Sequence, residues 1–250
     1  MYNLGIMPAA GCGTRLYPFK GAKELLPLGQ QIINGEIRPK IVSQYGFEAM
    51  KLAGVEHIII PTTPKKAQSF TDCFSDGKNF GVNISYLITD HTPSMVKTIN
   101  LALKNHREDR IFFGMPDTCI LPTNCFDQLL EKHLVTGSQL SLGLFHTSES
   151  YKYGMVNINQ KNEIIYHEDK PKDTSTKLMW GIAIWEPSFT EFILSVADDL
   201  SKNKIRELSF GDVIDKFMRE GNIIHGFVIE NGRYYDVGTY EGYKKAITEL

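Results

Sequence analysis

The feature that most constrains the fold is an alternation of short β-rich runs with helical patterns through the first half of the chain, with turn residues between them. The runs that predict strands are 4–7, 57–60, 83–88, 110–115 and 139–145. The segments that predict helices are 39–53, 95–104 and 124–135, the first with Pro39 at its start and Gly54 after its last turn. Strands that alternate with helices imply right-handed βαβ crossovers, so we expect an α/β fold with a mainly parallel sheet flanked by helices.

The second half of the chain has a different pattern. Segments 155–158 and 163–167 flank turn residues at 160–162, which predicts a hairpin and therefore antiparallel strands added to the sheet. Further strands are expected at 180–185 and 223–229, and helices at 187–200, 206–220 and 239–249. Because no repeat, low-complexity stretch or linker interrupts the chain, we expect one domain over residues 1–250, with functional halves at about 1–120 and 121–250.

Composition excludes several classes of protein. A chain of 250 residues that is 42% hydrophobic can build a sizeable core, which excludes a largely disordered protein. The net charge of -2 argues against a dedicated nucleic-acid or membrane-surface binder. No apolar run reaches the roughly 18 residues of a membrane span, and the N-terminus lacks the basic region of a signal peptide. The four cysteines form no C-x-x-C pair and no zinc spacing, so we expect reduced thiols and a cytoplasmic protein.

A run of small residues follows the first predicted strand. Its members are Ala9, Ala10, Gly11, Cys12, Gly13, Thr14 and Arg15. Small residues let backbone N–H groups approach a phosphate, although such a run is also typical of a simple tight turn. The run is not a G-x-x-x-x-G-K-[ST] loop, and Leu16 stands where the dinucleotide pattern needs its third glycine. Arg15 and Lys23 could bind phosphate oxygens at this loop, although the alternative is that both are solvated surface cations.

Two aspartates stand at places that suit a metal site. Asp117 follows the predicted strand 110–115, and ligands in open α/β sheets gather at the carboxyl ends of strands. Asp236 lies in the run Tyr-Tyr-Asp-Val-Gly-Thr, just before the last predicted helix. Two converging carboxylates can hold Mg²⁺, although an isolated aspartate of this kind is more often a turn residue or a helix cap.

The loop together with its downstream residues carries a family resemblance. The stretch 11–16, followed by Pro18 and by Lys23 with Leu25-Leu26-Pro27, resembles the signature of the sugar-phosphate nucleotidyltransferases, such as glucose-1-phosphate thymidylyl- and uridylyltransferases. Ala10 departs from the double glycine of many members, and the spacer from Pro18 to Lys23 is short. The resemblance covers nearly the whole chain. It implies the Rossmann-like nucleotide-diphospho-sugar transferase fold, with a nucleotide-binding half followed by a sugar-binding half that includes the antiparallel part.

The resemblance also implies an activity and roles for individual residues. The activity is magnesium-dependent joining of a nucleoside triphosphate to a sugar 1-phosphate, with release of pyrophosphate, in the supply of polysaccharide or glycoconjugate precursors. Residues 9–15 then form the nucleotide-binding loop, Arg15 and Lys23 are catalytic, and Asp117 and Asp236 are catalytic and hold the metal. No nucleic acid or membrane partner is implied, and self-association stays open.

Three further motifs resemble the family's sugar site. In His167-Glu168-Asp169-Lys170-Pro171, the lysine is expected to bind the sugar phosphate. The acid aligned with the motif is Asp169, with Glu168 just before it, and either could contact the sugar. Gly154 and Gly181 are expected beside the same pocket, although the alternatives are a hairpin glycine and a close-packed strand glycine.

The segment 90–97 departs from the family pattern. If Pro93 aligns, Asp90 replaces the base-reading glutamine and Met95 replaces a glycine. An ionised aspartate only accepts hydrogen bonds, so it suits the ring N–H of uracil or thymine, or the donors of guanine, and not the acceptor edge of cytosine. We therefore expect uridylyl, thymidylyl or guanylyl transfer if Asp90 reads the base. Alternatively, Asp90 caps the following helix from a distance or faces solvent.

Other functions are also compatible with the sequence. One is a cytidylyltransferase that acts on a non-sugar phosphate such as phosphocholine, and another is a nucleotide-sugar-sensing module without turnover. The presence of Lys170 and the two pocket glycines favours a sugar, and the presence of both aspartates and of Arg15 favours catalysis. A Rossmann oxidoreductase is disfavoured by the glycine pattern.

Overall fold

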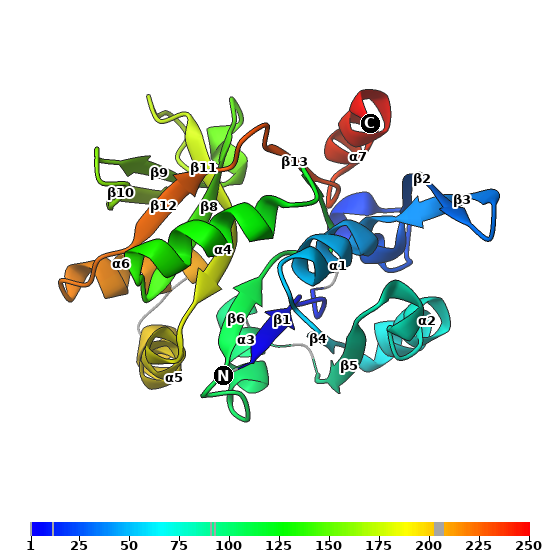
Figure 1. The fold of residues 1–250 in the computed structure, drawn as a ribbon, viewed down its shortest axis with the longest axis horizontal. Helices are drawn as coiled ribbons and strands as arrows, with labels where there is room; N and C mark the ends of the chain where they lie inside the picture. The colour runs from blue at the N-terminus through cyan, green and yellow to red at the C-terminus, as the bar shows by residue number, and fades with distance from the viewer. Residues whose placement is uncertain (1, 12, 91, 93, 203–207) are drawn as a thin grey trace.

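A mixed β-sheet forms the centre of the molecule in the computed structural model, which describes residues 2–11, 13–90, 92, 94–202 and 208–250 (Figure 1). Over these residues the sheet has nine strands, of which seven follow the order β10-β9-β11-β6-β1-β4-β5, while β8 pairs with β11 and β12 pairs with β8. The strands are β1 (Asn3–Ile6), β4 (His57–Thr62), β5 (Asn83–Ile88), β6 (Arg110–Phe113), β8 (Leu140–His146), β9 (Gly154–Ile158), β10 (Ile164–Asp169), β11 (Leu178–Trp185) and β12 (His225–Val228). β1 is parallel to both β4 and β6, and β4 is parallel to β5. β11 is antiparallel to its neighbours β6, β8 and β9.

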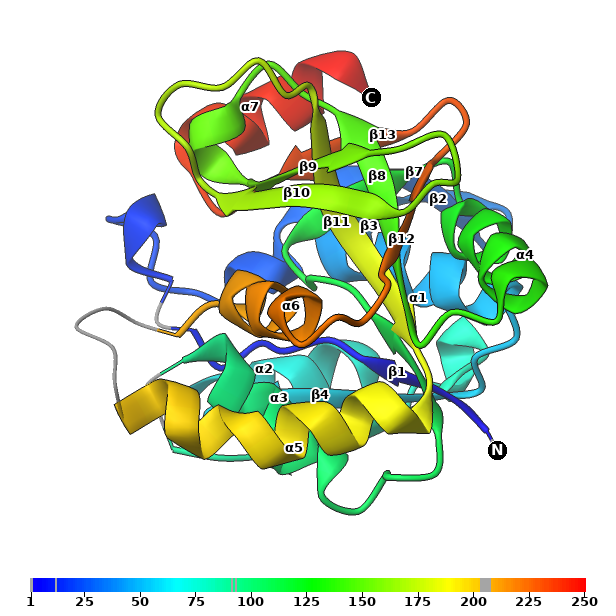
Figure 2. The ribbon, with the colours of Figure 1, turned by 90° about the vertical axis from the view of Figure 1, so that its left-hand side faces the viewer.

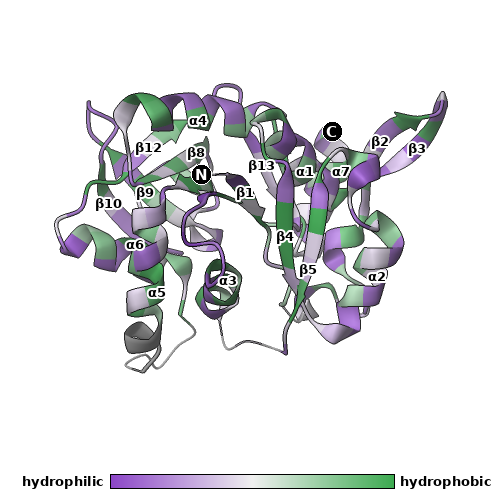
Figure 3. Cartoon of the chain, turned by 60° about the horizontal axis from the view of Figure 1, so that its bottom comes forward, coloured by the Kyte–Doolittle hydropathy of each residue, from purple (hydrophilic) through white to green (hydrophobic). Residues whose placement is uncertain are grey.

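Two small antiparallel sheets and several helices complete the fold. β7 (Thr118–Leu121) pairs with β13 (Arg233–Asp236), and β2 (Pro27–Ile33) with β3 (Glu36–Ile41) forms a hairpin that projects from the body (Figure 3). The α-helices are α1 (Val42–Leu52), α2 (Pro64–Phe74), α3 (Met95–Leu103), α4 (Cys125–Thr136), α5 (Pro187–Lys202), α6 (Phe210–Arg219) and α7 (Tyr240–Glu249). Short 3₁₀ turns are η1 (Thr14–Leu16), η2 (Lys23–Leu25), η3 (Lys78–Phe80) and η4 (Ser150–Lys152). Among the described residues, no helix is both long and apolar enough to cross a bilayer.

The core lies on both faces of the central sheet. Successive strand residues point to opposite faces, so in β6 Ile111 and Phe113 join one apolar cluster and Phe112 joins the other. The first cluster is covered by α3, α5 and α6 (Figure 2), and the second contains residues from α1, α2 and α4. Burial on both faces explains why the sequence shows nearly continuous apolar runs at β1, β4, β6, β8 and β11.

The predicted α/β fold is confirmed, with errors at two helix starts and several omissions. The helix expected at 206–220 begins at Phe210, after its cap residue Ser209, and residues 206 and 207 lie outside the described residues. The helix expected at 39–53 begins at Val42, because Pro39 and Ile41 pair with β2 as part of β3. Its first turn is closed by Gln44, whose side-chain oxygen accepts the backbone N–H of Ile41 at 2.6 Å. The hairpin β2–β3, helix α2 and the strands β7 and β13 were not predicted. α2 begins with Pro64 at its first turn, close behind Pro61.

Candidate active site

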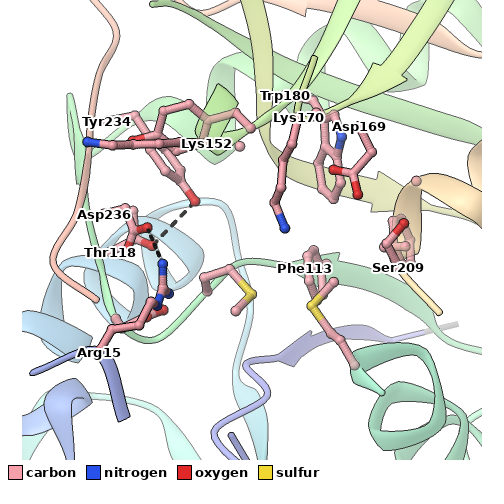
Figure 4. Close-up of a pocket in the computed structure, with 18 of the residues that line it drawn as sticks. Arg15, Phe113, Thr118, Lys152, Asp169, Lys170, Trp180, Ser209, Tyr234 and Asp236 are labelled. Atoms are coloured by element: carbon pink, nitrogen blue, oxygen red, sulfur yellow. Dashed lines mark hydrogen bonds and ion pairs between the residues drawn. The ribbon is translucent and has the colours of Figure 1, made fainter. Parts of the chain in front are cut away.

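A cavity of about 250 Å³ opens beside β6 and β11 and gathers residues from distant parts of the chain (Figure 4). The predicted site residues that line it are Arg15, Lys23, Asp117, Gly154, Asp169, Lys170, Gly181 and Asp236. Arg15 and Asp236 lie on one side of the cavity, and Asp169 and Lys170 lie on the other (Figure 4). The structure thus brings the motifs of both halves of the chain to one place.

The small-residue loop continues directly from β1. Beyond that strand, the N–H groups of Met7 and Ala9 donate to the carbonyl groups of Ile59 and Pro61, at 3.0 and 2.7 Å. Gly13 then adopts a left-handed conformation with φ 65°, which favours glycine, and η1 follows with Arg15 in it. Ala9 is buried, Ala10 and Gly11 line an adjoining cavity of about 120 Å³, and Cys12 lies outside the described residues.

Lys23 is a buried cation held by an anion. Its ammonium group forms an ion pair with the Asp117 carboxylate, and the two side chains are 13% and 6% exposed. Burial by itself would lower the pKa of Lys23, but the charge and the hydrogen bond of Asp117 raise it above the ordinary value. Lys23 is therefore a fixed positive charge at one side of the cavity.

The two-stranded sheet β7–β13 brings the two aspartates together. Asp117 immediately precedes β7, Asp236 ends β13 opposite Thr118, and the N–H of Val237 donates to the Asp117 carbonyl at 3.1 Å. Asp236 Oδ1 accepts the N–H of Gly238 at 2.7 Å, and Arg15 Nη1 lies 3.9 Å from Asp236 Oδ2. Burial, and then the negative charge of Asp117, raise the pKa of Asp236 above its ordinary value.

Both carboxylates face the same small space in front of Gly238. A methyl group added at Gly238 would lie 2.8 Å from Asp236 Oδ1 and 3.0 Å from Asp117 Oδ2. Within the described residues no group of three or more His, Cys, Asp or Glu side chains could hold a metal. Two carboxylates alone nevertheless fit Mg²⁺, which prefers oxygen ligands and usually completes its shell with substrate phosphates and water.

β10 delivers the predicted sugar-phosphate motif to the opposite side of the cavity. Asp169, its last residue, lines the cavity, whereas the Glu168 carboxylate accepts a hydrogen bond from the Tyr166 hydroxyl at the surface. The difference follows from the strand, because successive side chains point to opposite faces. Lys170 then turns with φ 55°, its N–H donates to the Tyr153 carbonyl at 2.9 Å, and its side chain points into the cavity (Figure 4).

These features allow a comparison with known proteins. A model of the nucleotidyl transferase family matches residues 4–250. The chain belongs to this family. It is 24% identical over 245 residues to a glucose-1-phosphate thymidylyltransferase of Neisseria meningitidis, a match that covers 97% of this chain and 80% of the relative. The predicted resemblance to sugar-phosphate nucleotidyltransferases is thereby confirmed.

Solved structures confirm the fold of this nucleotidyl transferase. A Bacillus anthracis protein crystallised with sucrose has a TM-score of 0.82 at 20% identity, over 98% of this chain and 94% of the other. A UDP-glucose pyrophosphorylase in complex with UDP-glucose has a TM-score of 0.78 at 22% identity, over 99% and 98% of the two chains. The nucleotide-diphospho-sugar transferase fold expected from the sequence is therefore present.

The two pocket glycines make room for aromatic rings. A methyl group on Gly154 would lie 2.3 Å from Trp180 Nε1, and one on Gly181 would lie 2.5 Å from Tyr234 Cε2. Tyr234 is partly buried, and burial raises the pKa of its hydroxyl well above the ordinary value. That hydroxyl accepts a hydrogen bond from Thr118 at 3.3 Å. Both glycines thus determine where rings that line the cavity can lie.

Sequence reasoning missed several lining residues of this nucleotidyl transferase. They include Lys152, Tyr153, Trp180, Ser209 and Tyr234. Lys152 precedes the Tyr-Gly of the glycine motif and pairs with Glu149; burial would lower its pKa, but the hydrogen bond and charge of Glu149 raise it. The sequence signal that could have identified Lys152 is a cation two residues before the glycine of this motif. The rings carried no such signal, because apolar strand residues also fill cores.

Asp90 lies apart from these residues. It is exposed after β5 and is not among the residues that line either cavity. Met95, the other departure from the family pattern, lines both cavities, while Pro93 lies outside the described residues. Reading of the base by Asp90 stays a prediction.

Replacement of Gly154 by alanine is expected to weaken binding on the Lys170 side of the cavity. The added methyl group would force the Trp180 indole to move, because 2.3 Å is far inside van der Waals contact. If Lys170 binds the sugar 1-phosphate, as the family resemblance implies, the KM of that substrate should rise about tenfold or more in steady-state kinetics with both substrates varied, with a smaller change for the nucleotide. Equal rises in both KM values would contradict this assignment.

Proposed function

We propose that this protein joins a nucleoside triphosphate to a sugar 1-phosphate and releases pyrophosphate. The observation that carries the proposal is the cavity itself, in which a carboxylate pair stands between cations on two sides: Arg15 and Lys23 on one, Lys170 on the other. Such an arrangement suits two phosphorylated substrates, because cations on both sides offset their charges and the carboxylate pair could hold a metal ion. The catalysts named among the relatives and solved structures, glucose-1-phosphate thymidylyltransferase and UDP-glucose pyrophosphorylase, support the same reaction class.

The proposed reaction needs no covalent enzyme intermediate. A phosphate oxygen of the sugar 1-phosphate attacks the α-phosphorus in line, a new P–O bond forms, and the bond to the β-phosphate oxygen breaks. Pyrophosphate leaves with that oxygen and the electron pair. The protein's contribution is therefore to position two anions and to offset their charge.

The residues on the nucleotide side have separate tasks in this proposal. Arg15 and the loop N–H groups hold the triphosphate and stabilise the departing pyrophosphate. Lys23 neutralises charge at the α-phosphate, since its hydrogen bond to Asp117 leaves two ammonium donors for phosphate oxygens. Asp117 and Asp236 would hold Mg²⁺, whose positive charge would offset the negative charge of the substrate phosphates.

The other side of the cavity would receive the sugar. Lys170 binds its phosphate and Asp169 accepts hydrogen bonds from its hydroxyls, in keeping with the exposure of Asp169, rather than Glu168, to the cavity. Gly154 and Gly181 let the sugar lie against Trp180 and Tyr234. On this proposal, residues 1–250 act as one catalytic domain with a nucleotide-binding half and a sugar-binding half.

A pyrophosphate-release matrix tests the proposal. ATP, CTP, GTP, UTP and dTTP are each combined with a set of hexose 1-phosphates and with phosphocholine, in Mg²⁺ and in EDTA. We expect Mg²⁺-dependent turnover with a hexose 1-phosphate and with UTP, dTTP or GTP. Absence of turnover with every sugar 1-phosphate would refute the function. Equal or better turnover with CTP would refute only the preference inferred from Asp90.

A further inference from the structure

A buried ion pair lies behind the nucleotide loop, outside both cavities. Lys66, on α2, is 10% exposed in its side chain, and Glu24, in η2, is 2% exposed. The Lys66 ammonium donates to Glu24 Oε1 at 2.8 Å and to the Ala9 carbonyl at 3.0 Å. Burial raises the pKa of Glu24, and the charge of Lys66 opposes that rise. The other carboxylate oxygen of Glu24 is buried and has no hydrogen-bond partner among the described residues.

This pair connects the segments that carry the proposed phosphate ligands. Both backbone polar groups of Ala9 are hydrogen-bonded, since its N–H donates to the Pro61 carbonyl and its own carbonyl accepts from Lys66. Glu24 directly follows Lys23, and its carbonyl accepts a hydrogen bond from the Ser43 hydroxyl of α1. One ammonium group therefore spans the start of the loop and the turn that presents Lys23.

A charged pair is an unusual way to fill this space. Desolvation of two charges offsets much of their attraction, and apolar side chains of similar volume often stabilise a core as well or better. A contribution to folding stability is therefore a poor explanation for the presence of the Lys66–Glu24 ion pair at this buried position. The contact of the ammonium group with a loop carbonyl offers an alternative, because a directional hydrogen bond fixes backbone position in a way that apolar packing does not.

We propose that Lys66 and Glu24 are positioning residues, which set the spacing between the nucleotide loop and Lys23 and thereby orient the triphosphate. The proposal rests on the nucleotidyl-transfer function proposed above. Neither residue lines the cavities, so both act through Ala9 and Lys23. The hydrogen bonds of Lys66 and Glu24 described here involve no residue of β10 or β11, the strands that line the proposed sugar side of the cavity.

Three variants separate positioning from simple stabilisation. Lys66→Met keeps the apolar stem and removes the charge, but leaves Glu24 buried without its partner. The double variant Lys66→Met with Glu24→Leu removes both charges and fills the space with apolar atoms, so it is expected to fold. Lys65→Met is the matched control, since Lys65 is the exposed neighbour on the same helix.

The kinetic measurement compares the effect of each variant on the nucleoside triphosphate with its effect on the sugar 1-phosphate. In the double variant, kcat/KM for the nucleoside triphosphate should fall about 10- to 100-fold. The KM of the sugar 1-phosphate should stay within about twofold, and Lys65→Met should match the wild type. Wild-type kinetics in a folded double variant would overturn the proposal, because apolar filling would then suffice. Equal losses for both substrates would also overturn it.

Hydrogen exchange gives a readout that needs no turnover. Peptides that contain Ala9, Ala10 and Gly11 should exchange faster in the double variant than in the wild type, while peptides from β10 should be unchanged. Unchanged exchange at the loop would count against the pair as a positioning device even if the enzyme had another substrate. Absence of wild-type turnover with accelerated loop exchange would instead refute the proposed function and leave the positioning role supported.

Discussion

Asp236→Asn is expected to lower turnover about 100-fold or more while the fold is kept, because the variant removes one of the two anionic oxygen donors proposed for Mg²⁺. Asparagine preserves the shape of the side chain and can still accept the Gly238 N–H. The measurement is pyrophosphate release over a Mg²⁺ titration. Asp127→Asn serves as the control, since Asp127 is an exposed carboxylate on α4. Unchanged Mg²⁺-dependent turnover in Asp236→Asn would contradict the metal assignment.

The same variant should not lose stability. Burial and the charge of Asp117 raise the pKa of Asp236, so its carboxyl group binds a proton more tightly in the folded protein than in the unfolded chain. A raised pKa contributes stability below the unfolded value, about 4, and that contribution is lost as the pH rises through the folded value. Asparagine stays neutral throughout. In EDTA, the melting temperature of the Asp236→Asn variant should therefore equal the wild-type value in acid and match or exceed it at pH 7. A clear loss of stability at pH 7 would show that Asp236 supports the fold.

Gly238→Ala is expected to reduce turnover by about 100-fold without a change of backbone conformation. The methyl group would lie 2.8 Å from Asp236 Oδ1, 2.9 Å from Arg15 Nη2 and 3.0 Å from Asp117 Oδ2. It would therefore fill the space that both carboxylates face. Gly238 has no left-handed φ, so its requirement for glycine comes from space rather than from backbone strain.

A second glycine provides the control for this experiment. Gly114 follows β6, and a methyl group there would make ordinary contacts of 3.5 Å with Met50 and Phe126. Gly114→Ala should thus keep nearly full turnover. The diagnostic measurement is the Mg²⁺ concentration for half-maximal turnover, which should rise in Gly238→Ala alone. Full activity of Gly238→Ala at wild-type Mg²⁺ concentrations would mean that no metal occupies this space.

Local patterns account for what could be predicted of the fold. Nearly continuous apolar runs predicted β1, β4 and β6, because strands covered on both faces carry few polar residues. Helix α2 was missed although its first turn accepts Pro64 readily. The hairpin β2–β3 was missed because its strands are largely exposed and lack an apolar pattern, and Pro39 was interpreted as a helix start instead of a strand residue.

The sequence by itself determined the loop, the order of the motifs and the family. These depend on neighbouring residues, such as the small residues that end at Gly13 with its left-handed backbone. The resemblance already implied that Asp117 and Asp236 share one site, but only the tertiary structure showed that β7 and β13 bring them together. It alone also placed Trp180 against Gly154 and Lys66 beside Glu24. The physical reason is that such contacts depend on strand pairing and on the packing of whole elements, and the separation of two residues along the chain does not specify either.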